Sequence, residues 1–481
     1  MTYAAPALPL EPLTPDALDA VHEQALRLLT EVGTEVHDDD MLERLRDAGQ
    51  RVDGTRVRWD PDWVLAQLAL APDGFMLTGR NPDRAVRIGG GSLVAMPVGG
   101  PPFAHDEERG RRDGSLADHV ELVKIAHASG RLPVLQSGTV EAQDLDAASR
   151  HLAMDYSILR WSDRPFMVYG TSGPKARDGF ELAALAAGGR EALAARPMTL
   201  AVVNPNSPLV WDGLMVTQLV ACAEYAQPVA ITPFLLAGAS APVTLAAGLS
   251  ILVAETLSGV AMAQLVRPGT PCLMGTFFTG VDMRSGGPSL GLPESVLTTL
   301  AGAQLARRYG LPLRGGGGSC SAIPLDAQAG AETTMSLWAT YLAGCDLVVH
   351  AAGWLEGGLV ASYEKLMLDL ELIRMFERLR EGLAVDAESL AFDAIAELGP
   401  GGLFLAHEHT LARFRTDVFM SPLFRSQAHP TWAKLGSPEL PQLAAGEWRR
   451  LLESYDDPGI DPELDAALRE YVDRRTRECE A

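Results

Sequence analysis

Aromatic and histidine side chains near the ends of two apolar runs are the residues best suited to bind a cation. Phe277 and Phe278 close one run, His350 lies in another, and Trp354 follows it. Cages of such rings recognise quaternary ammonium ligands, because the face of each ring is electron-rich. We therefore interpret Phe277, Phe278 and Trp354 as a candidate aromatic cage, with ordinary core packing as the alternative for each ring.

The other candidate residues form no familiar catalytic set. Asp282 and Glu356 each lie a few residues past an apolar run, where a solvated loop carboxylate is the simpler interpretation. His350 fits a ligand, an acid–base group or a hydrogen-bonded core residue. Cys320 follows four glycines, but the sequence shows no basic neighbour that would make it a thiolate nucleophile, so a small buried filler is favoured.

Cysteine and histidine spacing indicates neither a disulfide framework nor a metal site. The chain has 5 cysteines, an odd number, and they are spread widely without a CxxC pair or zinc-finger spacing: Cys222, Cys272, Cys320, Cys345 and Cys479. Such usage is typical of reduced thiols in a cytoplasmic protein. We expect no metal in this chain.

Charge and composition exclude several classes of protein. With 47% apolar and 21% charged residues, the composition of the 481-residue chain is that of a globular protein. Its 40 basic and 62 acidic residues give a net charge of −22, which argues against nucleic acid or an anionic membrane as a partner. The first 20 residues lack the features of a signal peptide, and the apolar segment 243–266 contains Glu255, so it predicts a buried internal helix.

Eight short apolar runs, each followed by a helix-length segment, must position these residues. This pattern of a strand followed by a helix, repeated at intervals of roughly 30–45 residues, predicts a (β/α)₈ TIM barrel of the α/β class. An open doubly wound sheet would usually show a GxGxxG turn after an early strand, and none is present. The runs are 92–100, 131–138, 164–171, 198–205, 228–234, 271–278, 311–318 and 346–353.

The rest of the chain flanks this barrel. We expect a mixed α/β cap over residues 1–90, the TIM-barrel catalytic domain over 91–382 and a C-terminal helical region over 383–481 packed on the barrel. Active sites of such barrels lie at the carboxyl ends of the strands. His350, Trp354 and Phe277 are therefore predicted to line one cavity at that end.

Several long segments resemble the trimethylamine methyltransferase family. They include VVNPNSPLVWD, GLPLRGGGGSCSAIPLDAQAGAETTM and HAAGWLEGGLVASYEKLMLD, and the resemblance extends from about residue 20 to about residue 475. It implies a TIM barrel that takes a methyl group from a methylated amine and passes it to the cobalt of a separate corrinoid protein. The archaeal trimethylamine enzymes carry pyrrolysine after the seventh strand, whereas this chain has Ser321, Ala322 and Ile323 in that loop.

The missing pyrrolysine favours a quaternary amine as the substrate. A quaternary ammonium loses a methyl group as a neutral amine and needs no acid, so betaine-like substrates such as glycine betaine, proline betaine or carnitine are expected. The resemblance implies His350 as the catalytic residue. It implies the substrate-binding residues Trp354, Phe277, Phe278, Asn204, Asp282 and Tyr363, and the corrinoid-facing loop glycines Gly315, Gly316, Gly317 and Gly318.

The resemblance also implies partners. The cofactor would be a corrinoid, as methylcobalamin, carried by a partner protein and not bound permanently, with a folate as the alternative methyl acceptor. A homo-oligomer in the cytoplasm is expected. Two other functions stay open: a different barrel enzyme such as an aldolase or lyase, and a non-catalytic protein that binds a methylated osmolyte. The eight runs contain no lysine for a Schiff base.

Overall fold

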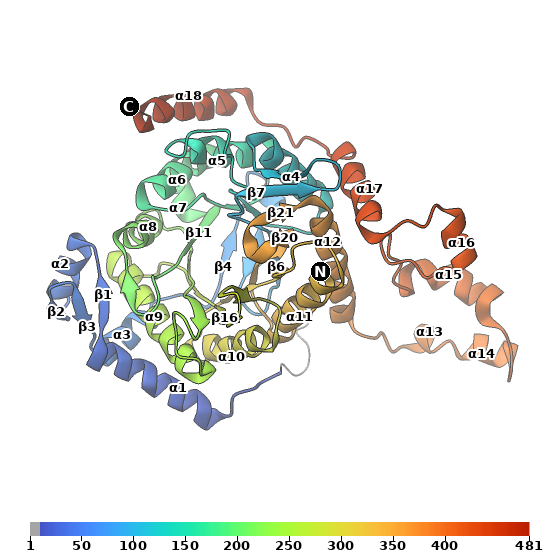
Figure 1. The fold of residues 1–481 in the computed structure, drawn as a ribbon, viewed down its shortest axis with the longest axis horizontal. Coiled ribbons are helices and arrows are strands. Elements are labelled where there is room, and N and C mark those ends of the chain that lie inside the picture. Colours follow the sequence, from blue (N-terminus) through green and yellow to red (C-terminus); the bar gives the residue numbers. More distant parts are fainter. Residues whose placement is uncertain (1–9, 481) are drawn as a thin grey trace.

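A barrel of eight parallel strands forms the centre of the molecule (Figure 1). The computed structural model describes residues 10–480, so residues 1–9 and 481 lie outside the described part. The signal-peptide expectation rests partly on those first nine residues. The strands are β6 (Val94–Pro97), β9 (Leu135–Gln136), β10 (Phe166–Met167), β11 (Thr199–Val203), β13 (Val229–Ile231), β15 (Cys272–Gly275), β18 (Leu313–Gly316) and β19 (Leu347–Ala352).

The order of these strands confirms the barrel prediction. Hydrogen bonding runs β6–β19–β18–β15–β13–β11–β10–β9, with every neighbouring pair parallel. The first and last strands of this order approach each other, since the Gly100 N–H donates to the Gly138 carbonyl at 2.7 Å just beyond their ends. Each strand lies inside one of the eight apolar runs.

A ring of helices covers the outside of the barrel (Figure 1). Capping residues set their limits: Ser115 accepts from the N–H of Asp118 at the start of α4, and Gly130 ends that helix at φ 69°. The helices are α4 (Leu116–Ser129), α5 (Arg150–Trp161), α6 (Gly173–Ala187), α7 (Arg190–Ala195), α8 (Gly213–Glu224), α9 (Leu245–Val266), α10 (Pro293–Tyr309), α11 (Ala327–Ala343) and α12 (Tyr363–Glu381).

Helix α9 is apolar on all sides because the protein surrounds it. It is the one described helix long and apolar enough to cross a membrane, yet 83% of its most apolar window is buried. This confirms the sequence prediction of an internal core helix for that segment.

The N-terminal part forms a small sheet against the side of the barrel. Its elements are α1 (Pro15–Arg27), the helical turn Leu28–Val32, β1 (Thr34–Val36), α2 (Asp39–Asp47), β2 (Arg51–Asp53), β3 (Arg56–Arg58) and α3 (Pro61–Leu68). Strand β1 pairs in parallel with β12 (Val210–Trp211), which belongs to the loop after β11. A hairpin of β4 (Phe75–Leu77) and β5 (Val86–Ile88) then packs Leu77 and Ile88 into a buried cluster with residues of the barrel strands.

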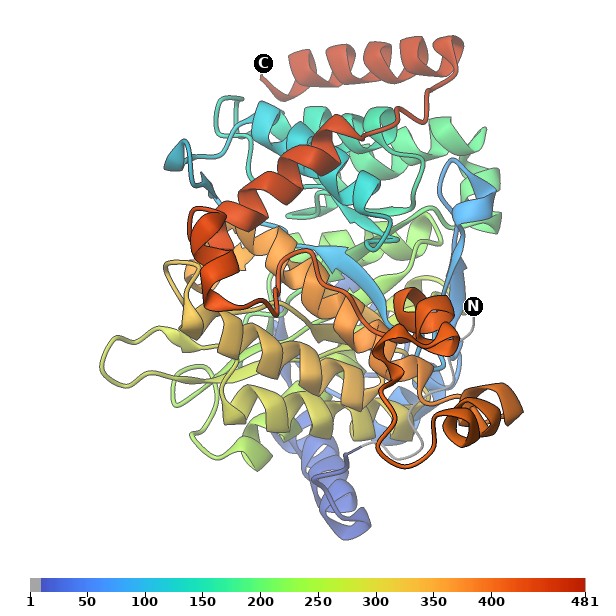
Figure 2. The same cartoon turned by 90° about the vertical axis from the view of Figure 1, so that its right-hand side faces the viewer.

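The C-terminal part divides into a projecting segment and two packed helices. The helices α13 (Ala387–Leu390), α14 (Phe392–Leu398), α15 (Glu408–Asp417) and α16 (His429–Lys434) lie in the arm, our name for residues 383–435, which extends away from the barrel (Figure 1). Helices α17 (Leu440–Glu453) and α18 (Pro462–Cys479) lie along the outer helices (Figure 2). Trp448 on α17 donates to Glu364 on α12 at 2.9 Å. The domain limits drawn from the sequence stay a prediction.

Candidate active site

A cavity of about 710 Å³ lies at the carboxyl ends of the barrel strands. All eight strands, or residues within two positions of their ends, contribute to its lining: Gly99, Gln136, Met167, Asn204, Thr232, Phe277, Arg314 and Val349. Short strands beyond the barrel extend its wall, namely β14 (Phe234–Ala237), β16 (Phe277–Val281) and β17 (Pro288–Ser289), and the sheet of β7 (Phe103–Asp106), β8 (Gly110–Asp113), β20 (Trp354–Leu355) and β21 (Val360–Ser362).

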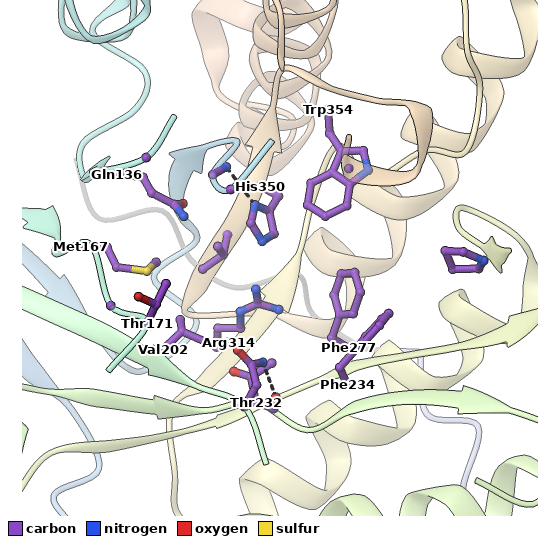
Figure 3. A pocket seen from close by; sticks show the side chains of 18 of the residues that line it. Gln136, Met167, Thr171, Val202, Thr232, Phe234, Phe277, Arg314, His350 and Trp354 are labelled. Atoms are coloured by element: carbon purple, nitrogen blue, oxygen red, sulfur yellow. Dashed lines mark hydrogen bonds between the residues drawn. The ribbon is translucent and has the colours of Figure 1, made fainter. Parts of the chain in front are cut away.

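One wall of the cavity is aromatic (Figure 3). The ring centroids of Phe234 and Phe277 are 4.8 Å apart, and those of Phe277 and Trp354 are 6.1 Å apart. The predicted residues His350, Trp354, Phe277 and Asn204 all line this cavity. The sequence reasoning did not single out Phe234, although it closes the fifth apolar run.

Trp354 belongs to both the cavity wall and the core. Its side chain is only 8% exposed, and its ring lies 4.5 Å from the His350 ring in an edge-to-face arrangement. Gly358 lies against the same indole: a Cβ at that position would come within 2.3 Å of the ring, at a φ of 97°. A side chain at position 358 would clash with the indole, so glycine is required there.

His350 is held as a neutral imidazole. Its Nδ1 accepts the Gly99 N–H at 3.2 Å, which leaves the ring proton on Nε2. Burial, and secondarily the charge of Arg314, hold the His350 pKa well below its ordinary value. At neutral pH the ring is thus a hydrogen-bond donor, without the extra proton that a general acid would deliver.

Arg314 is a buried cation at the cavity that the sequence reasoning missed. It is 3% exposed and lies on β18, with its guanidinium carbon 5.7 Å from the centroid of the Phe277 ring. Its Nε and Nη1 find no hydrogen-bond acceptor among residues 10–480. Burial lowers the pKa of Arg314 to about 10, so it stays charged at neutral pH. The signal in the sequence was an arginine inside an otherwise apolar strand, LPLRGG.

The opposite wall is polar. The Asn204 amide donates to the Thr232 carbonyl at 2.6 Å, while the Gln136 Oε1 is buried without a donor among the described residues. Glu141 accepts the Tyr169 hydroxyl at 2.8 Å and lies 3.5 Å from Arg150. Because the Glu141 charge is balanced by Arg150, it does not compensate the Arg314 cation.

Three predicted substrate-binding residues lie elsewhere. Phe278 follows Phe277 on a strand and points to the opposite face, where it packs on Gly248 of α9. Asp282 lies past the end of β16 and pairs with the exposed Arg284. Tyr363 begins α12, is fully buried and donates to Glu121 at 2.7 Å. These three residues do not line the cavity, and a substrate-binding role for them stays a prediction.

The four glycines that end the seventh run pack closely against neighbouring residues. A Cβ at Gly315 would lie 2.6 Å from the Cys345 sulfur, and one at Gly317 or Gly318 would approach Ala351 to 2.5 or 2.7 Å. At Gly316 the nearest cavity group would be the Phe277 ring, at 3.7 Å. Close packing therefore explains Gly315, Gly317 and Gly318, and a corrinoid-facing role for the four glycines stays a prediction.

The chain beyond these glycines is tied to the barrel by buried groups. The Lys365 Nζ donates to the Gly318 carbonyl at 3.2 Å and to Asp369 at 2.6 Å. Cys320 is fully buried, and burial raises the pKa of its thiol to about 11, as a filler residue requires. Within residues 10–480 no group of three His, Cys, Asp or Glu side chains is placed to hold a metal ion.

A closed parallel barrel with a cavity at the carboxyl ends of its strands defines the class of TIM-barrel enzymes. A family model described as trimethylamine methyltransferase matches residues 3–480. The chain therefore belongs to the trimethylamine methyltransferase family and is a methyltransferase. This confirms the resemblance found in the sequence.

Individual relatives share nearly the whole chain. A glycine betaine methyltransferase of Desulfitobacterium hafniense (strain Y51) is 38% identical over 466 residues, covering 97% of each protein. A proline betaine:corrinoid methyltransferase of Eubacterium limosum is 29% identical and covers 95% of this chain and 96% of that protein. The solved structure of the Methanosarcina barkeri monomethylamine methyltransferase has the same fold, with a TM-score of 0.56 at 12% identity over 93% of this chain and 89% of that one.

Proposed function

We propose that this methyltransferase removes a methyl group from a betaine-like quaternary amine and passes it to the Co(I) of a corrinoid carried by a partner protein. The observation that carries the proposal is the aromatic wall of Phe234, Phe277 and Trp354 on the cavity at the strand ends. The names of two relatives, one acting on glycine betaine and one on proline betaine with a corrinoid, support the substrate class and the acceptor.

The cavity is suited to a nucleophilic displacement in which the leaving group does not have to be protonated. The carbon–nitrogen bond breaks with both electrons going to nitrogen, and the leaving group is a neutral tertiary amine. A neutral His350 is sufficient for such a step, since no acid is required. The corrinoid supplies the nucleophile when it is docked.

The chain itself contributes binding, orientation and exclusion of water. Aromatic faces hold the ammonium without a counter-charge that would favour the substrate over the transition state. A fixed position for the methyl group converts the encounter into an ordered in-line reaction. No lysine among the described residues lines the cavity, which disfavours a Schiff-base aldolase.

We further propose that the chain acts in the cytoplasm as a homo-oligomer. Its five cysteines are free in the structure and four of them are buried, as in a reducing compartment. The arm exposes large apolar side chains by 75% or more at Leu383, Val385, Phe392, Leu403 and Leu405. Apolar surface that is permanently exposed favours a permanent partner, and a second copy of this chain is the one always present.

The test is a reconstituted methyl transfer. The purified chain is mixed with glycine betaine and either Co(I) cobalamin or a reduced corrinoid protein, and the loss of the Co(I) absorbance is followed together with dimethylglycine by mass spectrometry. Both signals are expected only when the enzyme and the betaine are present, and a folate acceptor is assayed in parallel. Binding of glycine betaine without transfer to either acceptor would contradict the proposal and favour an osmolyte-binding protein.

A further inference from the structure

We propose that Arg314 binds a carboxylate of the substrate and thereby restricts this cavity to zwitterionic quaternary amines. The inference rests on the proposed function, since it concerns the ligand of the same cavity. It assigns the anionic half of the substrate to a named residue, while the aromatic wall takes the cationic half.

The first argument is the unbalanced charge of Arg314. A buried cation is unfavourable unless an anion and hydrogen-bond acceptors accompany it. Arg314 is 3% exposed, and its Nε and Nη1 lack acceptors among residues 10–480. The one carboxylate that lines the cavity, within the described residues, is Glu141, and it is paired with Arg150 and Tyr169. The acceptors for Arg314 are therefore expected from the ligand.

The second argument is the position of Arg314 along the barrel. It pairs in register with Leu347, three residues before His350 on β19. Because a strand rises about 3.3 Å per residue, the Arg314 backbone lies deeper than those of His350 and Trp354. Figure 3 shows its guanidinium in the space below His350 and beside Phe277. A short zwitterion thus fits with its carboxylate inward and its ammonium toward Trp354.

The third argument is electrostatic selection. A bare cation such as choline would lie near the Arg314 charge and be repelled, whereas a carboxylate between the two cations removes that repulsion. The planar guanidinium also matches a carboxylate with two parallel hydrogen bonds, a geometry that a hydroxyl cannot reproduce. The cavity should therefore discriminate between ligands that share the same trimethylammonium group.

Calorimetric titration of glycine betaine and choline tests this selection, because the two differ by a carboxylate and a hydroxymethyl group. The wild-type protein is expected to bind glycine betaine at least about tenfold more tightly than choline, and Arg314→Gln to lose about tenfold or more for glycine betaine only. Arg164→Gln is the matched control: Arg164 is also buried, 8% exposed, but does not line the cavity, so the preference should persist.

The outcomes separate this inference from the proposed function. Equal wild-type affinities, or equal losses of both ligands in Arg314→Gln, overturn the role of Arg314 and leave the methyltransferase proposal standing. A wild-type protein that binds neither ligand overturns the proposed function. Thermal melts report folding, and if Arg314→Gln fails to fold, Arg314→Met decides: it removes the charge and the hydrogen-bond donors while keeping a long side chain, so an unchanged preference for glycine betaine over choline overturns the inference.

Discussion

Trp354 has a ring that contacts the cavity and a side chain that is largely buried, so its replacement should have two separate effects. Trp354→Ala is expected to weaken glycine betaine binding about tenfold, because a desolvated aromatic face contributes on the order of 1–2 kcal/mol to holding an ammonium. The same change should reduce the free energy of unfolding by about 3–5 kcal/mol, since the indole is only 8% exposed.

Trp354→Phe separates these two effects. It keeps an aromatic face in the wall and should retain most of the affinity, which calorimetric titration measures. Denaturant melts of both variants give the stability cost. If Trp354→Ala loses stability but binds glycine betaine as the wild type does, the indole is a packing residue and the aromatic-cage interpretation of Trp354 fails.

Protonation of His350 should not affect the pH dependence of the activity near neutral pH. Because its folded pKa is held well below 6.5, the imidazole stays neutral between about pH 6 and 8. We expect kcat/KM for glycine betaine to show no inflection from this group in that range. An inflection near pH 6.5 that disappears in His350→Gln would contradict the neutral-donor assignment.

The same residue has a stability consequence at low pH. The unfolded chain takes up a proton on this histidine near pH 6.5, whereas the folded chain does so only at lower pH. Stability is therefore complete above pH 6.5 and falls as the pH drops below it. His119, whose pKa burial lowers to about 4, contributes with the same sign.

The ends of the apolar runs in the sequence indicated some of the residues that line the cavity, but they did not indicate Arg314. His350, Phe277 and Asn204 were singled out because they lie near the ends of apolar runs, where a TIM barrel places its site, and all three line the cavity. Arg314 was missed because it lies in the middle of its apolar run, and its strand of four residues is too short for the period-2 alternation to show which side chains face inward. The same alternation turns Phe278 to the face of β16 opposite Phe277.

At the scale of elements, the barrel strands could be predicted from the sequence, whereas the short strands that extend the cavity wall beyond the barrel could not. The eight runs are apolar because both faces of a barrel strand are covered, and this composition is readable. The short strands β14, β17, β20 and β21 have two to four residues, and their pairing depends on tertiary neighbours more than on local preference. Phe234 and Trp354 of the aromatic wall lie on β14 and β20, so the geometry of this wall could not be predicted from the sequence.

Helix α9 fixes the loop after β11 through a buried carboxyl group. Glu255 accepts the Ser207 hydroxyl at 2.7 Å and the Leu209 N–H at 2.6 Å, and Ser207 lines the cavity. Burial raises the pKa of Glu255 to about 7 from an ordinary 4.5. Its stabilising contribution is therefore complete below pH 4.5 and is lost as the pH rises through 7.

Glu255→Gln tests this pH dependence. Glutamine keeps a neutral oxygen for the two donors but cannot ionise, so the variant should gain Tm relative to the wild type at pH 8.5 and much less at pH 5.5. Differential scanning calorimetry at both pH values measures the gain. A Tm difference that is the same at both pH values would show that Glu255 does not change protonation state.

At the scale of the whole molecule, the arm predicts self-association. Light scattering coupled to size exclusion should give a mass of at least twice the 51.4 kDa chain. Replacing Phe392 and Leu403 by aspartate should shift the protein toward the monomer, because both side chains are 75% exposed and would lie in a desolvated interface. Replacing the exposed Leu214 on α8, far from the arm in sequence and 59% exposed, is the control and should leave the mass unchanged. A wild-type monomer at micromolar concentration would contradict the prediction.

The pairing of β1 with β12 connects the first ninety residues to the barrel through backbone hydrogen bonds. Backbone hydrogen bonds join Glu35 to Leu209 at 2.9 Å and His37 to Trp211 at 2.8 Å, so the N-terminal segment supplies the neighbouring strand for the loop that carries Ser207. A barrel expressed alone from residue 91 would leave that edge unpaired beside the loop whose Ser207 lines the cavity. Truncated or fused versions of this enzyme should therefore retain the first ninety residues, however peripheral they look.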